Sequence, residues 1–231
     1  MNRKSYFDFI IIHYGKYLSD LGYSKIYQAG TGISFEKANA VLSNRVGLDI
    51  TMYDTINLSG ILWELQYKEL DKYFIRTILT KENRSEKDIK GRIKSDASFR
   101  DSISLTTERT TINIYSYQDA EQSFEVIRNY IEKEAEPFFA KYSQLRNVYE
   151  FLINSSKEVF WEKAGGTAIF YRELFIYKIY NEEKYQQYLK ELANFLEERN
   201  YKSYKAAFSE LVDYIENNVT RLREIYAPEM L

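Results

Sequence analysis

The chain has 231 residues, of which 45% are hydrophobic and 29% charged, and a chain of this length can bury a core without a disulfide or a structural metal. Its 32 basic and 34 acidic residues give a formal net charge of −2, which argues against non-specific binding of nucleic acids. The absence of cysteine excludes disulfides, thiol catalysis, zinc ribbons and iron–sulfur clusters, and the single histidine, His13, excludes multi-histidine metal sites.

Residues 4–21 predict a helix, because their apolar side chains recur at helical spacing. The predicted apolar face consists of Phe7, Ile10, Ile11, Tyr14, Tyr17, Leu18 and Leu21. Gly22 follows and is expected to end the helix in a left-handed conformation. Because Asp8 interrupts the apolar run, we expect no signal peptide, and no run of about 18 apolar residues predicts a membrane span.

The next segments change to a period of two. Residues 26–35 contain Gly30 and Gly32 among aromatic and β-branched residues, which predicts a hairpin. Residues 46–53 and 61–68 alternate apolar with polar or small residues, which is typical of half-buried strands. In the second of these strands, Glu64, Gln66 and Lys68 are expected to share the solvent-facing side.

Residues 81–101 are the most polar stretch and predict a loop with at most one weak helix, serving as a mobile surface loop or a functional flap. Residues 110–115 predict a short strand, and every pattern after Asp119 is helical, with a break or kink at Pro137. Gly165 and Gly166 predict a second break, which is followed by helices over residues 167–180, 182–199 and 202–226.

Strands gathered early and helices gathered late predict an α+β fold. We expect an N-terminal helix, an antiparallel sheet of about four to five strands and then a C-terminal group of helices. The glycine break suggests an α+β domain over residues 1–156, with residues 157–231 as a helical region packed on it. One continuous domain is the alternative.

Two short motifs carry a resemblance to a known family. Leu21-Gly22-Tyr23 leads from the first helix into a glycine-containing sheet, and Glu136-Pro137-Phe138-Phe139 joins two later helices. In this respect residues 5–153 resemble the bacterial domain-of-unknown-function family 4304. That family has no established activity, so the resemblance implies a fold and lends no catalytic or binding residues.

One constellation suggests catalysis. Asp49 or Asp54, followed by Glu64 or Gln66 and then Lys68, resembles the core of the restriction-nuclease-like fold. In that arrangement two acidic groups hold Mg²⁺ and a lysine orients the attacking water. The simpler interpretation is that Glu64, Gln66 and Lys68 form the solvated face of an amphipathic strand.

The chain contains 22 tyrosines, more than its buried helix faces require. Tyrosine is enriched in protein interfaces, so the candidate interface residues are Tyr171, Tyr177, Tyr180 and Tyr201. Core packing is the competing explanation for these residues.

The resulting hypothesis is an uncharacterised bacterial, cytoplasmic protein that acts as a non-catalytic protein-interaction module of an accessory or immunity-like kind. Its expected partner is another protein. We expect no cofactor, no membrane association and no nucleic acid. The alternative is the metal-dependent nuclease with Asp49, Glu64 or Gln66, and Lys68.

Overall fold

The computed structural model describes residues 2–29, 32–52, 55–105 and 112–230. The chain forms two compact units, one of residues 1–65 and 100–141 and the other of residues 66–99 and 142–231. This division differs from the expected boundary at residue 156, because residues 66–99 and 142–156 group with the C-terminal helices. Asp54 lies outside the described residues.

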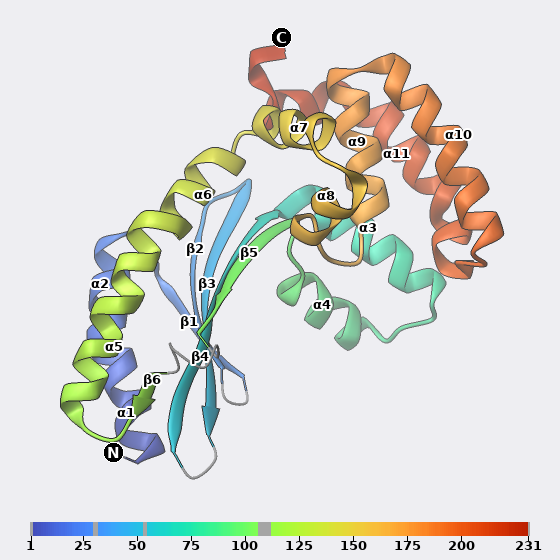
Figure 1. Cartoon of the computed structure of the whole chain (residues 1–231). Coiled ribbons are helices and arrows are strands. Elements are labelled where there is room, and N and C mark those ends of the chain that lie inside the picture. The colour runs from blue at the N-terminus through green and yellow to red at the C-terminus, as the bar shows by residue number, and fades with distance from the viewer. Residues whose placement is uncertain (1, 30–31, 53–54, 106–111, 231) are drawn as a thin grey trace. The chain divides into compact units, whose positions relative to one another are not determined.

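The first unit consists of a helical layer and a sheet (Figure 1). Its helical segments are α1 (Arg3–Phe9), η1 (Ile10–Tyr14), α2 (Gly15–Asp20), α5 (Tyr117–Tyr130), η2 (Ile131–Ala135) and α6 (Glu136–Tyr142). The strands are β1 (Lys25–Ala29), β2 (Gly32–Ala38), β3 (Leu42–Met52), β4 (Ile56–Tyr67), β5 (Phe99–Ser104) and β6 (Ile112–Ile114). Among the described residues the sheet has six strands in the order β1-β2-β3-β4-β5, and β6 pairs with β4. The predicted α+β class is confirmed.

Alternation along the strands explains which side of the sheet is covered. Buried residues alternate with partly exposed ones over the middle of β2, β3 and β4, and the buried ones include Phe35, Val46, Leu48, Trp63 and Leu65. The helices α1, α2 and α5 lie along one face of the sheet (Figure 1). In this core Tyr14 and Ser123 share a hydrogen bond of 3.0 Å between their hydroxyl groups. The two-residue period of the strands therefore marked the buried face correctly as far as Leu65, whereas the prediction that Gln66 faces solvent is wrong, because Gln66 is buried.

The first helix departs from the predicted regular pattern. The segment η1 is π-helical, and its wider turn shifts the side chains that follow Phe9 around the helix axis. Ile10 and Tyr14 are buried, but Ile11 is 42% exposed and Ile12 is 64% exposed. The prediction that Ile11 belongs to the buried face is therefore wrong. Gly22 has a φ of 90° and ends the helix as predicted.

A second π-helical segment explains how the chain accommodates Pro137. Proline has no backbone N–H and disrupts the hydrogen-bond ladder of a regular helix. The widened turn η2 ends at Ala135, directly before α6, so the ladder has already changed its spacing when Pro137 is reached. The predicted kink at Pro137 thus takes the form of a π-helical turn that precedes it.

The second unit is helical. Its helices are α3 (Lys68–Lys81), α4 (Glu86–Ser95), α7 (Leu145–Asn154), α8 (Lys157–Lys163), α9 (Ile169–Tyr180), α10 (Glu182–Glu198), α11 (Lys202–Tyr226) and η3 (Pro228–Met230). The central helix α9 packs against α3, α7, α10 and α11, and most of its side chains are buried. The three predicted C-terminal helices are confirmed as α9, α10 and α11.

Two predictions about the middle of the chain are wrong. Residues 81–101 were expected to form a loop with at most one weak helix; α4 is that helix, but the segment also contains the start of β5, so it is not mainly a loop. Lys68 was expected on the outer face of a strand, but β4 ends at Tyr67 and Lys68 begins α3. In the described part of the chain, no helix has the length and apolar character needed to cross a membrane.

Candidate functional site

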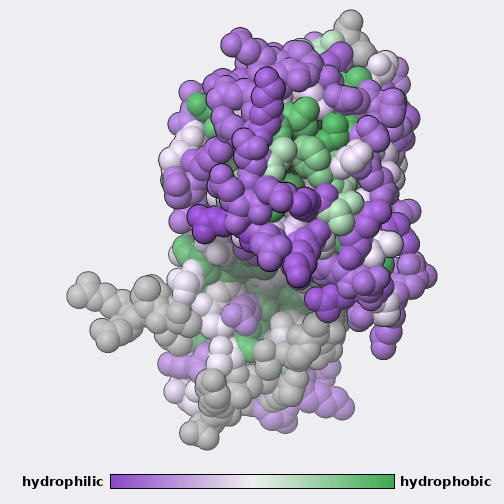
Figure 2. Space-filling model, turned by 90° about the vertical axis from the view of Figure 1, so that its right-hand side faces the viewer, coloured by the Kyte–Doolittle hydropathy of each residue, from purple (hydrophilic) through white to green (hydrophobic). Residues whose placement is uncertain are grey.

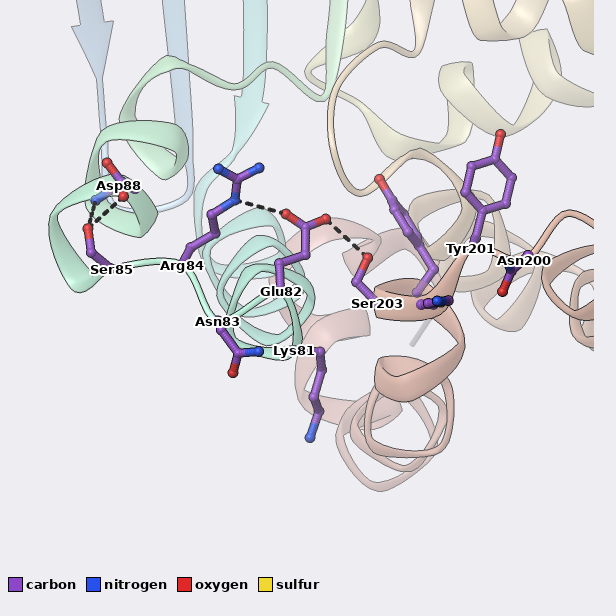
Figure 3. Close-up of a pocket in the computed structure, with 11 residues that line it drawn as sticks. Lys81, Glu82, Asn83, Arg84, Ser85, Asp88, Asn200, Tyr201 and Ser203 are labelled. Carbon is purple, nitrogen blue, oxygen red and sulfur yellow. Dashed lines mark hydrogen bonds and ion pairs between the residues drawn. The ribbon is translucent and has the colours of Figure 1, made fainter.

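An open groove lies between two helix turns of the second unit (Figure 3). One turn joins α3 to α4 and the other joins α10 to α11. The groove has a volume of about 990 Å³ and is open to solvent. Its lining residues are Lys81, Glu82, Asn83, Arg84, Ser85, Asp88, Asn200, Tyr201, Lys202, Ser203 and Tyr204. It therefore combines part of the polar stretch 81–101 with one of the predicted interface tyrosines.

The two turns are built in the same way. Asn83 and Asn200 have φ values of 56° and 54°, in the left-handed region that asparagine tolerates better than most residues. After α3, the Arg84 N–H donates to the Leu79 carbonyl at 3.1 Å. After α10, the Tyr201 N–H donates to the Leu196 carbonyl at 3.3 Å. These bonds are those of the Schellman motif, which reverses the chain sharply after a helix.

Glu82 connects the two turns. Ser203 Oγ donates a hydrogen bond of 3.0 Å to Glu82 Oε1, and Arg84 Nε lies 3.2 Å from Glu82 Oε2. Figure 3 shows Glu82 between the two residues that it binds. At the start of α4, Ser85 Oγ accepts a hydrogen bond of 3.1 Å from the Asp88 N–H and so caps the helix. The backbone of both turns is therefore held by hydrogen bonds, and Glu82 links one turn to the other across the groove.

Tyr201 is the exposed aromatic residue of the groove, with 42% of its surface accessible. Its ring centroid lies 5.7 Å from that of Phe195, 5.8 Å from that of Tyr204 and 6.1 Å from that of Phe170. Three aromatic neighbours thus hold the ring in place while part of it faces solvent. Among the described residues, the ammonium group of the neighbouring Lys202 has no hydrogen-bond or ion-pair partner.

Tyr204 stabilises the floor of the groove. Its hydroxyl donates a hydrogen bond of 2.6 Å to the Thr167 carbonyl. Burial raises the pKa of Tyr204 to about 12, so the hydroxyl stays protonated at neutral pH and keeps its role as donor.

The predicted interface tyrosines do not form one surface. Tyr171 is fully buried, and its hydroxyl donates a hydrogen bond of 2.6 Å to the Tyr204 carbonyl, so it is a core residue. Tyr177 is half-buried against Tyr188, with ring centroids 5.5 Å apart. Tyr180 is also half-buried and donates a hydrogen bond of 2.7 Å to Glu229. Only Tyr201 of the four lines the groove.

The residues of the nuclease hypothesis are placed as follows. Asp49 and Glu64 line one depression on the open face of the sheet, with a volume of about 260 Å³. Arg45 donates a hydrogen bond of 2.9 Å to Glu64. Gln66 is buried, and its amide donates a hydrogen bond of 2.7 Å to the Ile93 carbonyl. Lys68 lies on α3, so the predicted strand face that combines all three polar residues does not exist.

Sequence reasoning named Tyr201 but missed the groove itself. The signals were Asn83 and Asn200, because an asparagine after a helical pattern is a typical C-terminal signal. Comparisons with models of known families, with curated proteins and with solved structures gave no match for this chain. The resemblance to family 4304 therefore stays a prediction.

Proposed function

We propose that this chain is a non-catalytic protein-interaction module, of an accessory or immunity-like kind, that acts in the bacterial cytoplasm. The observation that carries the proposal is Tyr201, which is 42% exposed in the groove while its ring is held by Phe170, Phe195 and Tyr204. A rigid, partly exposed aromatic side chain loses little entropy on binding, which is why tyrosine is frequent at binding hot spots.

The lining of the groove supports a protein partner. Small-molecule sites are mostly apolar and enclosed. This groove is open and mixes basic side chains, such as Arg84 and Lys202, with acidic and neutral polar ones. Such a lining offers donors and acceptors to a polar loop of another protein around one aromatic contact. Figure 2 shows a further cluster of hydrophobic residues at the surface, enclosed by hydrophilic ones, as is typical of interaction surfaces.

The test is affinity capture from a lysate of the source cells, quantified by mass spectrometry and followed by calorimetry with the purified partner. Tyr201→Ala is expected to weaken binding by about 2 kcal/mol or more, as for a hot-spot residue. Tyr117→Ala is the matched control, because Tyr117 is 63% exposed and does not line the groove. The proposal fails if every captured protein binds the Tyr201→Ala variant as tightly as the unaltered chain.

The second candidate is a metal-dependent nuclease, and one observation favours it. Asp49 and Glu64 line the same depression, as two magnesium ligands must. Within the described ranges, no group of three or more histidine, aspartate or glutamate side chains is placed to hold a metal ion. Incubation of plasmid and single-stranded DNA with the protein and Mg²⁺ tests this candidate. The nuclease candidate requires that the unaltered chain cleaves DNA and that Asp49→Asn does not. Equal activity of the unaltered chain and the variant excludes this candidate.

A further inference from the structure

A small cavity in the second unit is lined mainly by aromatic side chains. It lies among α8, α9 and α10 and has a volume of about 60 Å³. The lining residues are Lys157, Trp161, Phe170, Tyr188, Glu191, Leu192 and Phe195. About 10–15 Å³ of such space holds one water molecule, so the cavity has room for a group of a few non-hydrogen atoms.

The planes of the aromatic rings around this space are steeply inclined to one another. Trp161 and Phe170 have ring centroids 5.7 Å apart and an angle of 77° between their planes. Phe170 and Phe195 have centroids 5.3 Å apart and an angle of 66°. These rings pack edge to face against one another and also line the cavity. The faces of aromatic rings carry negative potential, which attracts cations.

A buried carboxyl group lies behind two of these rings. Glu173 is 0% exposed, and its Oε2 accepts hydrogen bonds from Trp161 Nε1 at 3.2 Å and from the Tyr188 hydroxyl at 2.8 Å. These bonds fix the orientation of both rings and turn the negative end of the carboxyl group toward them. In the described part of the chain, Glu173 Oε1 has no hydrogen-bond partner. Buried polar atoms rarely lack a partner, so this geometry is costly and is not explained by packing alone.

The protein's own lysine already makes the contacts that a bound cation would make. Lys157 Nζ lies 5.3 Å from the centroid of the Tyr188 ring and 3.6 Å from Glu191 Oε2. The Lys157 side chain is 52% exposed, and an exposed ion pair of this kind contributes little to stability. Lys157 can therefore turn into solvent at low cost and leave the ring and Glu191 to another cation.

We propose that this cavity binds an alkylammonium group, which takes the place of the Lys157 ammonium between the Tyr188 ring and Glu191. The group is small, cationic and weakly hydrated at its methyl or methylene end, so it matches both the volume and the aromatic lining. Such a group is carried by a lysine side chain of another protein and by a free amine. The inference does not depend on the groove, although Phe170 and Phe195 also contact Tyr201.

The experiment follows the indole N–H signal of Trp161 by nuclear magnetic resonance during titration of the whole chain with methylammonium chloride. The chain has two tryptophans, so Trp161→Phe identifies the signal. Sodium chloride at equal ionic strength and methanol are the controls for salt and for the uncharged analogue. The expected result is a saturable shift with methylammonium alone. A shift that methanol reproduces overturns the proposal.

Removal of the resident lysine sharpens the test. Lys157→Met and Lys157→Ala are both expected to bind methylammonium about tenfold more tightly, because the competing cation is gone. The alanine variant cannot fill the cavity with its own side chain. Lys178→Met is the matched control, since Lys178 also lies over a tyrosine ring, that of Tyr185, and pairs with Glu182 outside the cavity. The control is expected to bind as the unaltered chain does.

Two further measurements complete the design. Glu191→Gln in the Lys157→Ala background is expected to weaken methylammonium binding about tenfold, and equal affinity would contradict the proposed site. Comparison of methylammonium with the peptide Gly-Lys-Gly distinguishes the sources of the group. Tighter binding of the peptide indicates a protein lysine, and tighter binding of methylammonium indicates a free amine. The proposal is overturned if neither compound shifts the Trp161 signal in either Lys157 variant while near-ultraviolet circular dichroism shows intact packing.

Discussion

Arg172 on α9 and Asp71 on α3 form an ion pair in which the two side chains are only 4% and 0% exposed. Ser98 Oγ also donates to Asp71, and Arg172 Nη1 donates to the Gly165 carbonyl. The Tyr67 N–H completes the network with a bond of 2.7 Å to Ser98 Oγ. Burial raises the pKa of Asp71, and Arg172 and Ser98 oppose this shift. The network fixes how α3, α9 and the glycine-containing turn meet in the second unit.

Disruption of this pair has an expected energetic signature. Asp71→Leu and Arg172→Met each leave a buried charge without its partner, so each is expected to lower the free energy of unfolding by about 3–5 kcal/mol. The double variant removes both charges and is expected to lose much less than the sum of the two single losses. Urea unfolding of the four proteins measures the coupling. Strict additivity would show that the two residues act independently.

The buried carboxyl group of Glu173 is expected to make the folded protein less stable as the pH rises. Burial raises the pKa of Glu173 above its ordinary value of 4.5, although hydrogen bonds from Tyr188 and Trp161 oppose the shift. The folded protein therefore holds this proton more tightly than the unfolded chain. Its contribution to stability is greatest below pH 4.5 and is lost as the pH rises through the folded-state pKa.

The variant that isolates this effect is Glu173→Gln, which keeps the shape but stays neutral. Relative to the unaltered chain, it is expected to raise the melting temperature more at pH 8 than at pH 4. Thermal unfolding followed by circular dichroism at both pH values provides the comparison. An equal difference at the two pH values would assign the effect to packing and not to ionisation.

Glu36 predicts the opposite dependence on pH in the first unit. It lies between Lys25 and Arg45 in the register of β1, β2 and β3. Burial alone raises the pKa of Glu36, but hydrogen bonds from Ser43 and Tyr27 and the charges of Lys25 and Arg45 together lower it below 4.5. Its stabilising contribution is therefore present above pH 4.5 and is lost as the pH falls through the lowered value.

Glu36→Gln is expected to remove this part of the acid sensitivity, so the variant loses less stability than the unaltered chain between pH 5 and the acid transition. Glu121→Gln is the control, because Glu121 is exposed on α5 and has no hydrogen-bond or ion-pair partner in the residues that the structure describes. Urea unfolding over a series of acidic pH values measures both. Parallel profiles for Glu36→Gln and Glu121→Gln would refute the assignment.

Gly166 and Gly91 provide a pair of alanine substitutions with opposite expected signs. Gly166 has a φ of 89°, and a Cβ there would lie only 2.7 Å from the Ala97 carbonyl oxygen and closer still to Asp96. Gly166→Ala is therefore expected to cost about 2 kcal/mol or more. Gly91 lies within α4 with open space around it, so Gly91→Ala is expected to stabilise by about 0.5–1 kcal/mol. Chemical unfolding of both variants tests the contrast, and a stabilised Gly166→Ala would contradict the structure.

Periodicity predicted those elements that bury a continuous face. Helix α11 shows a clear stripe because Leu211, Ile215 and Leu222 are fully buried at helical spacing. Helix α4 buries only Ile89, so it has no stripe to detect, and its signal was the capping pair of Ser85 and Asp88. Strand β5 lies at an edge of the sheet, and its sequence has only two large apolar residues, Phe99 and Ile103, which is why the start of this strand was not predicted.

The boundary between β4 and α3 could not be predicted from periodicity for a different reason. Strand β4 ends at Tyr67 and helix α3 begins at the next residue, Lys68, without a glycine, proline or other turn residue at the boundary. The alternation of polar and apolar residues therefore continues past the end of the strand. The groove was also hard to predict from the sequence. Tyr201 could be named from composition, but its neighbours in the groove come from a turn more than 100 residues earlier in the chain. The packing of α3 against α11 brings these two turns together, and the hydrogen bond from Ser203 to Glu82 joins them.

The interleaved composition of the two units sets an order of assembly during synthesis. The chain passes from one unit to the other at residues 65–66, 99–100 and 141–142. All of the first unit has been made once residue 141 is added, whereas Asp71 must wait for Arg172, which is 101 residues further along the chain. At about 5–20 residues per second, a ribosome needs roughly 5–20 s to supply that arginine. The sheet-containing unit can therefore close on the nascent chain while α3 still exposes an apolar face that chaperones can bind.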